Sequence, residues 1–309
     1  MSKKESHPAP VPHLKQGEYS DGSPLDEVQY LECKLILKPE PFTAAKVFLE
    51  FGKLVAQTAK EFGIVLRDDG IVLKPQIREV VFGDTADFRL YNNAFILRRR
   101  LAYKDGFPAG EPEIVFKFRH PDMQKAAELD MRPNIIGKYR IKFKAEALPL
   151  KDQVGGYRLL FSHNAQFPLS QAPEGYRTEG YRTSLGTMAR VFPGLAQLKP
   201  SDADQVHLVN ETFVEEVLQD LGVLDFGKGF TAGANIAIWR ERGTHHPMCA
   251  EFAYQAKFKR RDELHNKALD RCRQFFIALQ QSHRNWLSLG TTKTGLVYRL
   301  KGNPPQSHE

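Results

Sequence analysis

Stretches in which polar and apolar residues alternate strictly recur along most of the chain. In the clearest of them, residues 138–147, every even position is charged and every odd position is apolar or aromatic. The same alternation marks 28–37, 113–119 and 250–259. Because successive side chains of a strand point to opposite faces, each of these strands has one apolar and one polar face. Further strands are predicted at 64–66, 77–82, 95–103, 157–161, 235–242 and 296–300.

Three longer segments carry apolar residues at helical spacing and are predicted to be amphipathic helices. They are residues 43–62, 204–221 and 262–289. A glycine follows each of them, which is the residue that most often ends a helix. A shorter helix is predicted at 184–191. The strands are close together in sequence, which favours hairpins and antiparallel pairing.

The composition predicts one domain between two tails. Residues 1–26 contain no apolar core and are predicted to be a disordered tail, as are residues 303–309. The domain spans 27–302, a length that can bury a core of ordinary size. Within it, residues 149–200 are rich in Gly, Pro, Ser and Gln and are expected to form a loop-rich excursion.

Overall composition, 41% hydrophobic and 26% charged residues, is typical of a globular protein. No apolar run approaches the roughly 18 residues that span a bilayer, so no membrane association is expected. The chain has three cysteines, Cys33, Cys249 and Cys272, without the spacing of a metal site or a disulfide framework. A cytoplasmic protein is therefore predicted. The net charge of +7 indicates an anionic partner, for which nucleic acid, polyphosphate and acidic lipid all qualify.

The polar faces of the predicted strands are unusually basic. They carry Arg98, Arg100, Lys117, Arg119, Arg140, Lys142, Lys144, Arg240, Arg242, Lys257 and Lys259, with Glu32, Glu113, Glu146 and Glu251 among them. Two arrangements fit this pattern. Either a sheet packs one face under the helices and leaves the other in water, or the sheet curls so that the charged faces meet inside a barrel.

In the barrel arrangement, many like charges repel across a confined space and require a polyanion to offset them. Arginine and lysine are the side chains that suit phosphate oxygens. Nucleic acid fits less well, because most aromatic residues fall on the faces opposite the basic residues, whereas stacking platforms belong beside the charges.

Residues 82–106, FGDTADFRLYNNAFILRRRLAYKDG, resemble the diagnostic segment of the triphosphate tunnel metalloenzymes, also called the CYTH superfamily. The matching positions are Asp84, Thr85, Leu90, Leu97, Arg98 and Arg100. The following strand, EIVFKFRHPD, resembles the family's next strand, with Lys117 and Arg119 at its basic positions. The first strand, YLECKLIL, resembles the opening Glu-x-Glu-x-Lys strand, with Tyr30 in place of the first Glu. The resemblance covers about residues 28–119.

This resemblance implies an α+β fold, an antiparallel β-barrel of about eight strands with amphipathic helices outside and a polar tunnel inside. Members of the family hydrolyse triphosphates, form cyclic AMP or handle polyphosphate, usually with Mg²⁺ or Mn²⁺. The chain is accordingly expected to be a metal-dependent phosphohydrolase acting on inorganic triphosphate or a nucleoside triphosphate. A class IV-type adenylate cyclase and a polyphosphate- or nucleotide-binding protein without turnover remain as alternatives.

The resemblance and the strand pattern together suggest roles for individual residues. The expected catalytic residues are Lys34, Arg98, Arg100 and Lys117. The expected phosphate-binding residues are Arg119, Arg140, Lys142, Lys144, Arg240, Arg242, Lys257 and Lys293. The expected metal ligands are Glu32, Glu146 and Glu251, because carboxylates hold hard divalent cations. Tyr30, Ala253 and Gln255 stand where the family has further carboxylates, which favours the binding-protein alternative.

Overall fold

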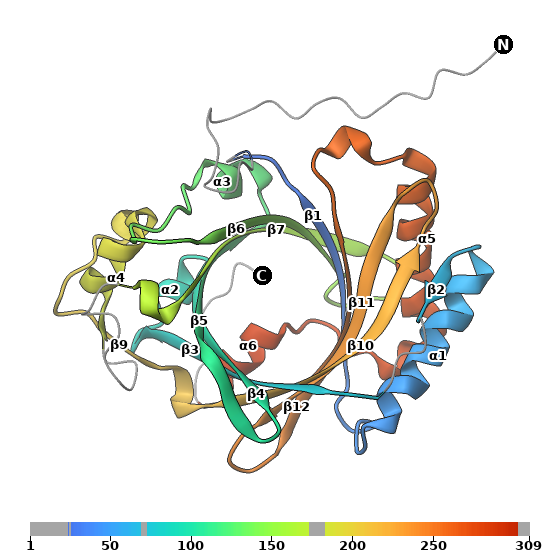
Figure 1. Ribbon diagram of the computed structural model, residues 1–309, viewed down its shortest axis with the longest axis horizontal. Coiled ribbons are helices and arrows are strands. Elements are labelled where there is room, and N and C mark those ends of the chain that lie inside the picture. Colours follow the sequence, from blue (N-terminus) through green and yellow to red (C-terminus); the bar gives the residue numbers. More distant parts are fainter. Residues whose placement is uncertain (1–23, 25, 69–72, 173–182, 302–309) are drawn as a thin grey trace.

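The computed structural model describes residues 24, 26–68, 73–172 and 183–301, and in them the strands close into a barrel (Figure 1). Nine strands of this described part form the ring, since β10 pairs with both β11 and β3. In ring order they are β10 (Val214–Asp225), β11 (Thr231–Glu241), β12 (Pro247–Lys257), β1 (Tyr30–Leu37), β6 (Arg140–Pro149), β7 (Tyr157–Pro168), β5 (Phe107–His120), β4 (Phe95–Lys104) and β3 (Gln76–Thr85).

The predicted α+β barrel is confirmed, with two differences in its wall. The ring has nine strands in the described residues, rather than about eight. One neighbouring pair, β1 and β6, runs parallel, while the other pairs of the ring are antiparallel. The sheet also extends outside the ring through β2 (Val65–Arg67), β9 (Gln205–Leu208) and β8 (Thr183–Ser184).

Two helices cover one side of the barrel wall. α1 (Lys46–Glu61) and α5 (Asn266–Ser282) lie over the outer faces of β10, β11, β12 and β1 (Figure 1). Phe51 of α1 meets Phe252 of β12 at a ring-centroid distance of 5.7 Å, and Phe275 of α5 is buried in the same cluster. The apolar stripes of the helices and the apolar faces of the strands therefore exclude water from each other.

Shorter helices cover the opposite side of the wall, over the outer faces of β4, β5, β6 and β7. They are α3 (Met123–Glu128), α4 (Leu185–Val191) and the 3-10 helix Pro193–Leu198. Phe192 stacks on Phe116 of β5 at 4.0 Å between ring centroids. The remaining helical segments are α2 (Arg89–Asn92) and the 3-10 turns Leu169–Gln171, Val209–Glu211, Arg261–Glu263 and Arg284–Trp286. With both sides covered, the apolar strand faces point outward and the charged faces point inward.

One helix lies inside the ring of strands (Figure 1). This helix is α6 (Lys293–Tyr298), and its Val297 and Tyr298 pack with Ile36, Phe82 and Trp239 in a cluster of buried residues. These strand residues share the inward face with the charged residues of their strands. The interior is therefore apolar at the end that α6 occupies and charged beyond it.

Two predicted elements are wrong in type. Residues 204–221 form β9 and the first part of β10 instead of a helix. In β10, Val214 faces the cluster around α6 while Val217 packs against the outer cluster, so apolar residues on both faces imitate a helical spacing. Residues 296–300, predicted as a strand, fall on the end of α6, whose Thr292 side chain caps it by accepting from the Gly295 amide.

The other predicted elements are confirmed with shifted ends. The range 149–200 contributes β7 to the barrel wall, so only part of it lies outside the barrel. Residues 173–182 of that range and almost all of the two predicted tails lie outside the described residues. The three cysteines are buried, free thiols. In the part of the chain that the structure describes, no helix has the length and apolar character needed to cross a membrane.

Candidate functional site

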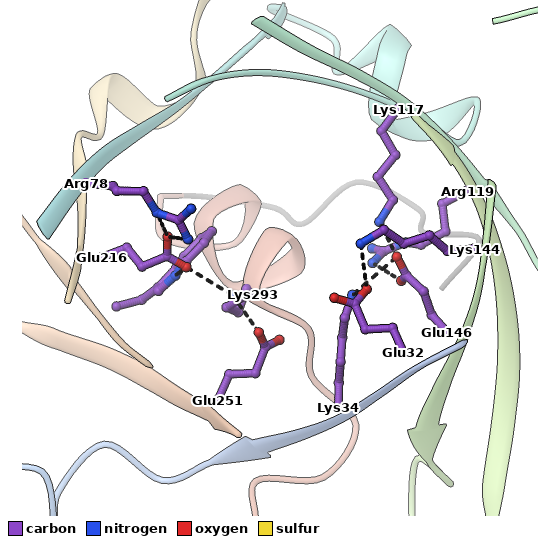
Figure 2. A network of polar contacts seen from close by, with 11 residues as sticks. Glu32, Lys34, Arg78, Lys117, Arg119, Lys144, Glu146, Glu216, Glu251 and Lys293 are labelled. Atoms are coloured by element: carbon purple, nitrogen blue, oxygen red, sulfur yellow. Dashed lines mark hydrogen bonds and ion pairs between the residues drawn. The ribbon is translucent and has the colours of Figure 1, made fainter. Parts of the chain in front are cut away.

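Two carboxylates lie side by side on the parallel strands β1 and β6. Glu32 and Glu146 are register partners, and the ammonium group of Lys34 bridges them (Figure 2). Lys34 Nζ lies 2.9 Å from Glu32 Oε2 and 3.2 Å from Glu146 Oε1. Lys144 approaches Glu32 Oε2 at 3.2 Å, and Lys117 of β5 donates to Glu146 Oε1 at 2.7 Å. Three lysines from three strands thus converge on one carboxylate pair.

The charged side chains of this cluster shift one another's pKa values. Burial alone would raise the pKa of Glu32, but Lys144 and Lys34 lower it to about 2. Glu146 is only 1% exposed, and Lys117, Lys34 and Arg119 hold its pKa well below the usual range despite burial. Both carboxylates are therefore ionised. Burial also lowers the pKa of Lys117 well below its ordinary value, even beside Glu146.

A second carboxylate pair, Glu216 of β10 and Glu251 of β12, lies apart from the first pair in the barrel interior (Figure 2). Lys293 of α6 bridges it, with Nζ 2.6 Å from Glu251 Oε1 and 3.4 Å from Glu216 Oε1. Glu216 also accepts from Arg78 Nε at 2.8 Å and from the indole nitrogen of Trp239 at 2.9 Å. These cations and the indole hold the pKa of Glu216 below its usual range, against the effect of burial. Each pair of carboxylates in the interior is thus bridged by one ammonium group.

Two arginines of β4 face the interior between these groups. Arg100 donates to Glu113 of β5, and Arg140 lies 3.6 Å from the same carboxylate. Arg98 has no carboxylate within ion-pair distance in the described residues, and its buried Nε has no hydrogen-bond partner there. Burial, and next the neighbouring Arg100, lowers the pKa of Arg98. Since a guanidinium remains protonated at neutral pH, Arg98 is a cation in need of an anion.

Lysines gather around an aromatic ring at the other end of the interior. Tyr30 lies six residues before Ile36, or about 20 Å along β1 from the apolar cluster at α6. The ammonium groups of Lys142, Lys144 and Lys257 lie 5.7, 5.9 and 5.8 Å from the centre of its ring. Burial lowers the pKa of Lys142 to about 8, and the neighbouring cation of Lys144 adds to the effect. The positive charge therefore continues to this end of the barrel.

Most of the residues expected at the site meet in the barrel interior. They are Glu32, Lys34, Arg98, Arg100, Lys117, Arg119, Arg140, Lys142, Lys144, Glu146, Glu251, Lys257 and Lys293. Arg119 lies 3.6 Å from Glu146 Oε2, so it joins the first carboxylate pair (Figure 2).

Arg240 and Arg242 are not brought to the interior, which corrects their expected role in binding phosphate. Arg240 pairs with Glu215, and Arg242 pairs with Glu79 and covers the ring of Tyr103 at 4.5 Å. These residues lie on the outer face of the wall. Trp239 takes the inward position of β11 at this point, and the register between β11 and β12 shifts after it.

Sequence reasoning missed Arg78, Glu216 and Trp239 as residues of the interior. Glu216 lay in the segment predicted to be a helix, so its face could not be assigned. Arg78 is followed on the same face of β3 by Val80 and Phe82, which pack near α6. A strand face that is charged at one end and apolar at the other gives no simple alternation. The signal that could have found Arg78 and Glu216 is their position two residues from an inward apolar residue, Val80 and Val214 respectively.

Asp84, from the Asp-Thr motif, has a structural position. Its carboxylate accepts from the amides of Leu90 and Tyr91 at 2.9 and 3.0 Å, and from the hydroxyl of Tyr298 at 3.0 Å. Burial raises the pKa of Asp84 to about 6, although these hydrogen bonds favour the charged form. Asp84 therefore fixes α2 and α6 to the wall.

The expected metal ligands do not form a common cluster. Within the described residues, no three Asp, Glu, His or Cys side chains are arranged to hold a metal ion. Glu32 and Glu146 share the ammonium of Lys34, while Glu251 shares that of Lys293 with Glu216. The donor set does not fit a divalent cation, because ammonium groups already contact the carboxylate oxygens.

No family model matches the sequence. No curated protein matches it either. Similar solved structures include a Hippeastrum protein described as a candidate adenylyl cyclase with a dominant triphosphatase activity, which is 12% identical and aligns 88% of this chain with 95% of its own at a TM-score of 0.41. A candidate adenylate cyclase from Bacillus halodurans is 10% identical, with coverage of 86% and 95% and a TM-score of 0.38. One from Vibrio parahaemolyticus is 9% identical, with coverage of 88% and 99% and a TM-score of 0.35.

Proposed function

We propose that the barrel binds a triphosphate-containing small molecule or a short polyphosphate, with the phosphate chain in its charged interior. The observation that supports this most directly is the state of Arg98. Its buried Nε has no hydrogen-bond partner among the described residues, and Arg100 lies on the same face of β4. A buried cation that makes no direct ion pair is costly, and an anion that enters the barrel lowers the cost.

The surplus of positive charge extends beyond Arg98. Glu32 and Glu146 share four basic side chains, Lys34, Lys117, Lys144 and Arg119. Lys142 and Lys257, near Tyr30, contact an aromatic ring and no carboxylate in the described residues. A chain of phosphates places several negative charges at short intervals, so it can contact basic residues from several strands at once. Guanidinium forks add pairs of directed hydrogen bonds.

Turnover of the bound molecule is a separate prediction from the resemblance to the triphosphate tunnel family. A hydrolase would cleave a phosphoanhydride bond, and a cyclase would use a hydroxyl of the nucleotide as the nucleophile. Both reactions depend mainly on positioning and on stabilising charge. A turnover assay with inorganic triphosphate and ATP separates these enzymes from a binding protein, because only an enzyme releases orthophosphate, pyrophosphate or cyclic AMP.

The binding proposal can be tested by calorimetric titration of the protein with inorganic triphosphate. We expect saturable binding at one site, and a loss of about tenfold or more in affinity for Arg98→Gln, since 1.4 kcal/mol is tenfold and a charge-assisted hydrogen bond exceeds this. Arg240→Gln is the matched control, because it removes an arginine from the outer face of the same wall. Equal losses for the two variants, or no binding by the wild type at millimolar triphosphate, would refute the proposal.

A further inference from the structure

Two ammonium groups occupy the positions between paired carboxylates in the barrel. Lys34 Nζ lies 2.9 and 3.2 Å from oxygens of Glu32 and Glu146. A divalent cation held by two carboxylates lies between them in the same way, at about 2.0–2.6 Å from their oxygens. In this pair, an ammonium therefore stands where a bound metal would be.

The second pair, Glu216 and Glu251, repeats this arrangement on β10 and β12 (Figure 2). Lys293 Nζ lies 2.6 Å from Glu251 and 3.4 Å from Glu216. This lysine comes from α6, which is fixed inside the ring by Val297 and Tyr298. Its ammonium is also 4.7 Å from the centre of the Trp239 ring, so three partners from three strands hold it. The two bridging ammonium groups thus come from different elements, β1 for Lys34 and α6 for Lys293.

A divalent cation that entered the first pair would meet strong repulsion. Besides Lys34, the ammonium of Lys117 lies 2.7 Å from Glu146, and that of Lys144 lies 3.2 Å from Glu32. Ser162 also donates to Glu146 Oε1, at 2.6 Å. The metal would have to displace these donors and remain beside several unpaired cations.

Tyr30 also makes the interior less suited to a divalent cation. The family places a carboxylate at this position, which would add to a metal site. Here the aromatic ring lies among Lys142, Lys144 and Lys257, each within 6 Å of its centre. At this position the chain therefore surrounds an incoming ligand with lysines, and Tyr30 supplies no carboxylate to a metal.

We infer that the barrel takes triphosphate as the free polyanion, and that lysine ammonium groups serve where the family uses a divalent cation. This inference rests on the proposed function and specifies the ionic form of its ligand. The basic residues that contact the two pairs outnumber the four carboxylates, which leaves positive charge to contact phosphate oxygens; they are Lys34, Lys117, Lys144, Arg119, Arg78 and Lys293. A magnesium complex of triphosphate carries less negative charge and retains water molecules on the metal, so it fits this lining less well.

The first experiment is a calorimetric titration of the wild type with inorganic triphosphate, in EDTA and in excess Mg²⁺ at equal ionic strength. We expect binding in EDTA. In excess Mg²⁺ we expect the affinity to fall about tenfold, because Mg²⁺ forms a complex with triphosphate and lowers the concentration of the free polyanion. Binding that requires Mg²⁺, or that Mg²⁺ tightens, would overturn the inference and leave the proposed function standing. Absence of binding in both solutions would instead remove the proposed function, and the inference with it.

The second experiment measures thermal stability in Mn²⁺ without triphosphate. We expect no rise in Tm for the wild type and a rise for Lys34→Met, in which Glu32 and Glu146 lose the bridging ammonium. Lys142→Met is the matched control, since among the described residues this lysine contacts the Tyr30 ring and forms no ion pair with a carboxylate. Stabilisation of the wild type by Mn²⁺, or no difference between the two variants, would contradict the inference. The wild-type titration remains decisive if Lys34→Met does not fold.

Discussion

The hydroxyl of Tyr298 donates a hydrogen bond to Oδ2 of Asp84 at 3.0 Å, and this contact ties the helix inside the barrel to the barrel wall. The ring of Tyr298 also stacks on Tyr91 at 4.1 Å between centroids. Both contacts lie at the end of α6. Lys293, at the start of the same helix, reaches Glu216 and Glu251. A buried structural contact therefore helps to place a basic residue of the candidate site.

Replacement of Tyr298 by Phe should destabilise the fold by about 1.5–3 kcal/mol at neutral pH, because it removes a hydrogen bond to a buried charged group and keeps the ring. Urea denaturation would measure the change. Tyr157→Phe serves as control, since Tyr157 is partly exposed and packs its ring on Phe276. The control should stay within about 0.5 kcal/mol of the wild type. Equal effects of the two variants would show that the contact with Asp84 contributes nothing.

The cost of Tyr298→Phe should also depend on pH. The pKa of Asp84 is raised to about 6 in the folded protein from 3.8, so its contribution to stability is fully present below about pH 3.8 and is lost as pH rises through 6. The Tyr298 hydroxyl opposes this loss because it favours the ionised carboxylate. We therefore expect Tyr298→Phe to be more destabilising at pH 8 than at pH 4.5, in denaturation curves of both proteins. A cost that is equal at both pH values would contradict this account.

Glu146→Gln should be among the most destabilising substitutions in the barrel. Glu146 is the common partner of Lys34, Lys117 and Arg119, and it is almost completely buried. Removal of one partner from a buried ionic group costs about 3–5 kcal/mol, because the other charges stay behind. Chemical denaturation would measure it. Glu113→Gln, nearer the surface and paired with Arg100 and Arg140, is the control and should cost less. The reverse order would refute the central role of Glu146.

The barrel wall could be predicted from sequence wherever one face of a strand is uniformly apolar. In β6 the outward residues pack under helices and the inward residues are almost all charged, so alternation was decisive. In β12 the apolar outward face, with Phe252 and Tyr254, was equally clear. The rule failed in β10, where Val214 and Glu216 share the inward face and Val217 packs outside. Alternation reports the difference between two faces, and it is lost where both faces contain apolar residues.

The candidate site could be predicted where the motif residues and the alternation agreed, as at Glu32, Lys34 and Arg98. It could not be predicted on β11, because Arg240 and Trp239 are neighbours and only the contact of Trp239 with Glu216 decides which one points inward. The role of α6 was also hidden. Six residues carry too little periodicity to distinguish a helical turn from a strand, and the helix is held by tertiary contacts with distant strands.

Arg98→Gln should leave the stability of the ligand-free protein within about 0.5 kcal/mol of the wild type, or raise it. The guanidinium has no ion pair in the described residues to lose, and its removal relieves repulsion with Arg100. Arg78→Gln is the control, since Arg78 donates to the buried Glu216, and it should cost about 1–3 kcal/mol. Thermal melts without ligand would compare them. Strong destabilisation by Arg98→Gln would mean that this arginine stabilises the fold through a structural partner, and that it is not available to bind an anion.

Binding of triphosphate should transfer a proton to Lys142. Burial and the nearby cation of Lys144 lower the pKa of Lys142 to about 8 in the free protein, so its ammonium is about half protonated at pH 8. A bound polyanion favours the charged form and raises this pKa again. Calorimetric titrations at pH 8 in buffers with different ionisation enthalpies would therefore report uptake of about half a proton more for the wild type than for Lys142→Met.

The same comparison at pH 6 provides the control. There Lys142 is already protonated before the ligand binds, so the wild type and Lys142→Met should exchange equal numbers of protons with the buffer. Protons that the phosphate chain itself gains or loses cancel between the two proteins at each pH. A difference that persists at pH 6 would place the titrating group elsewhere in the barrel. Equal proton exchange at pH 8 would show that the phosphate chain does not reach the lysines around Tyr30.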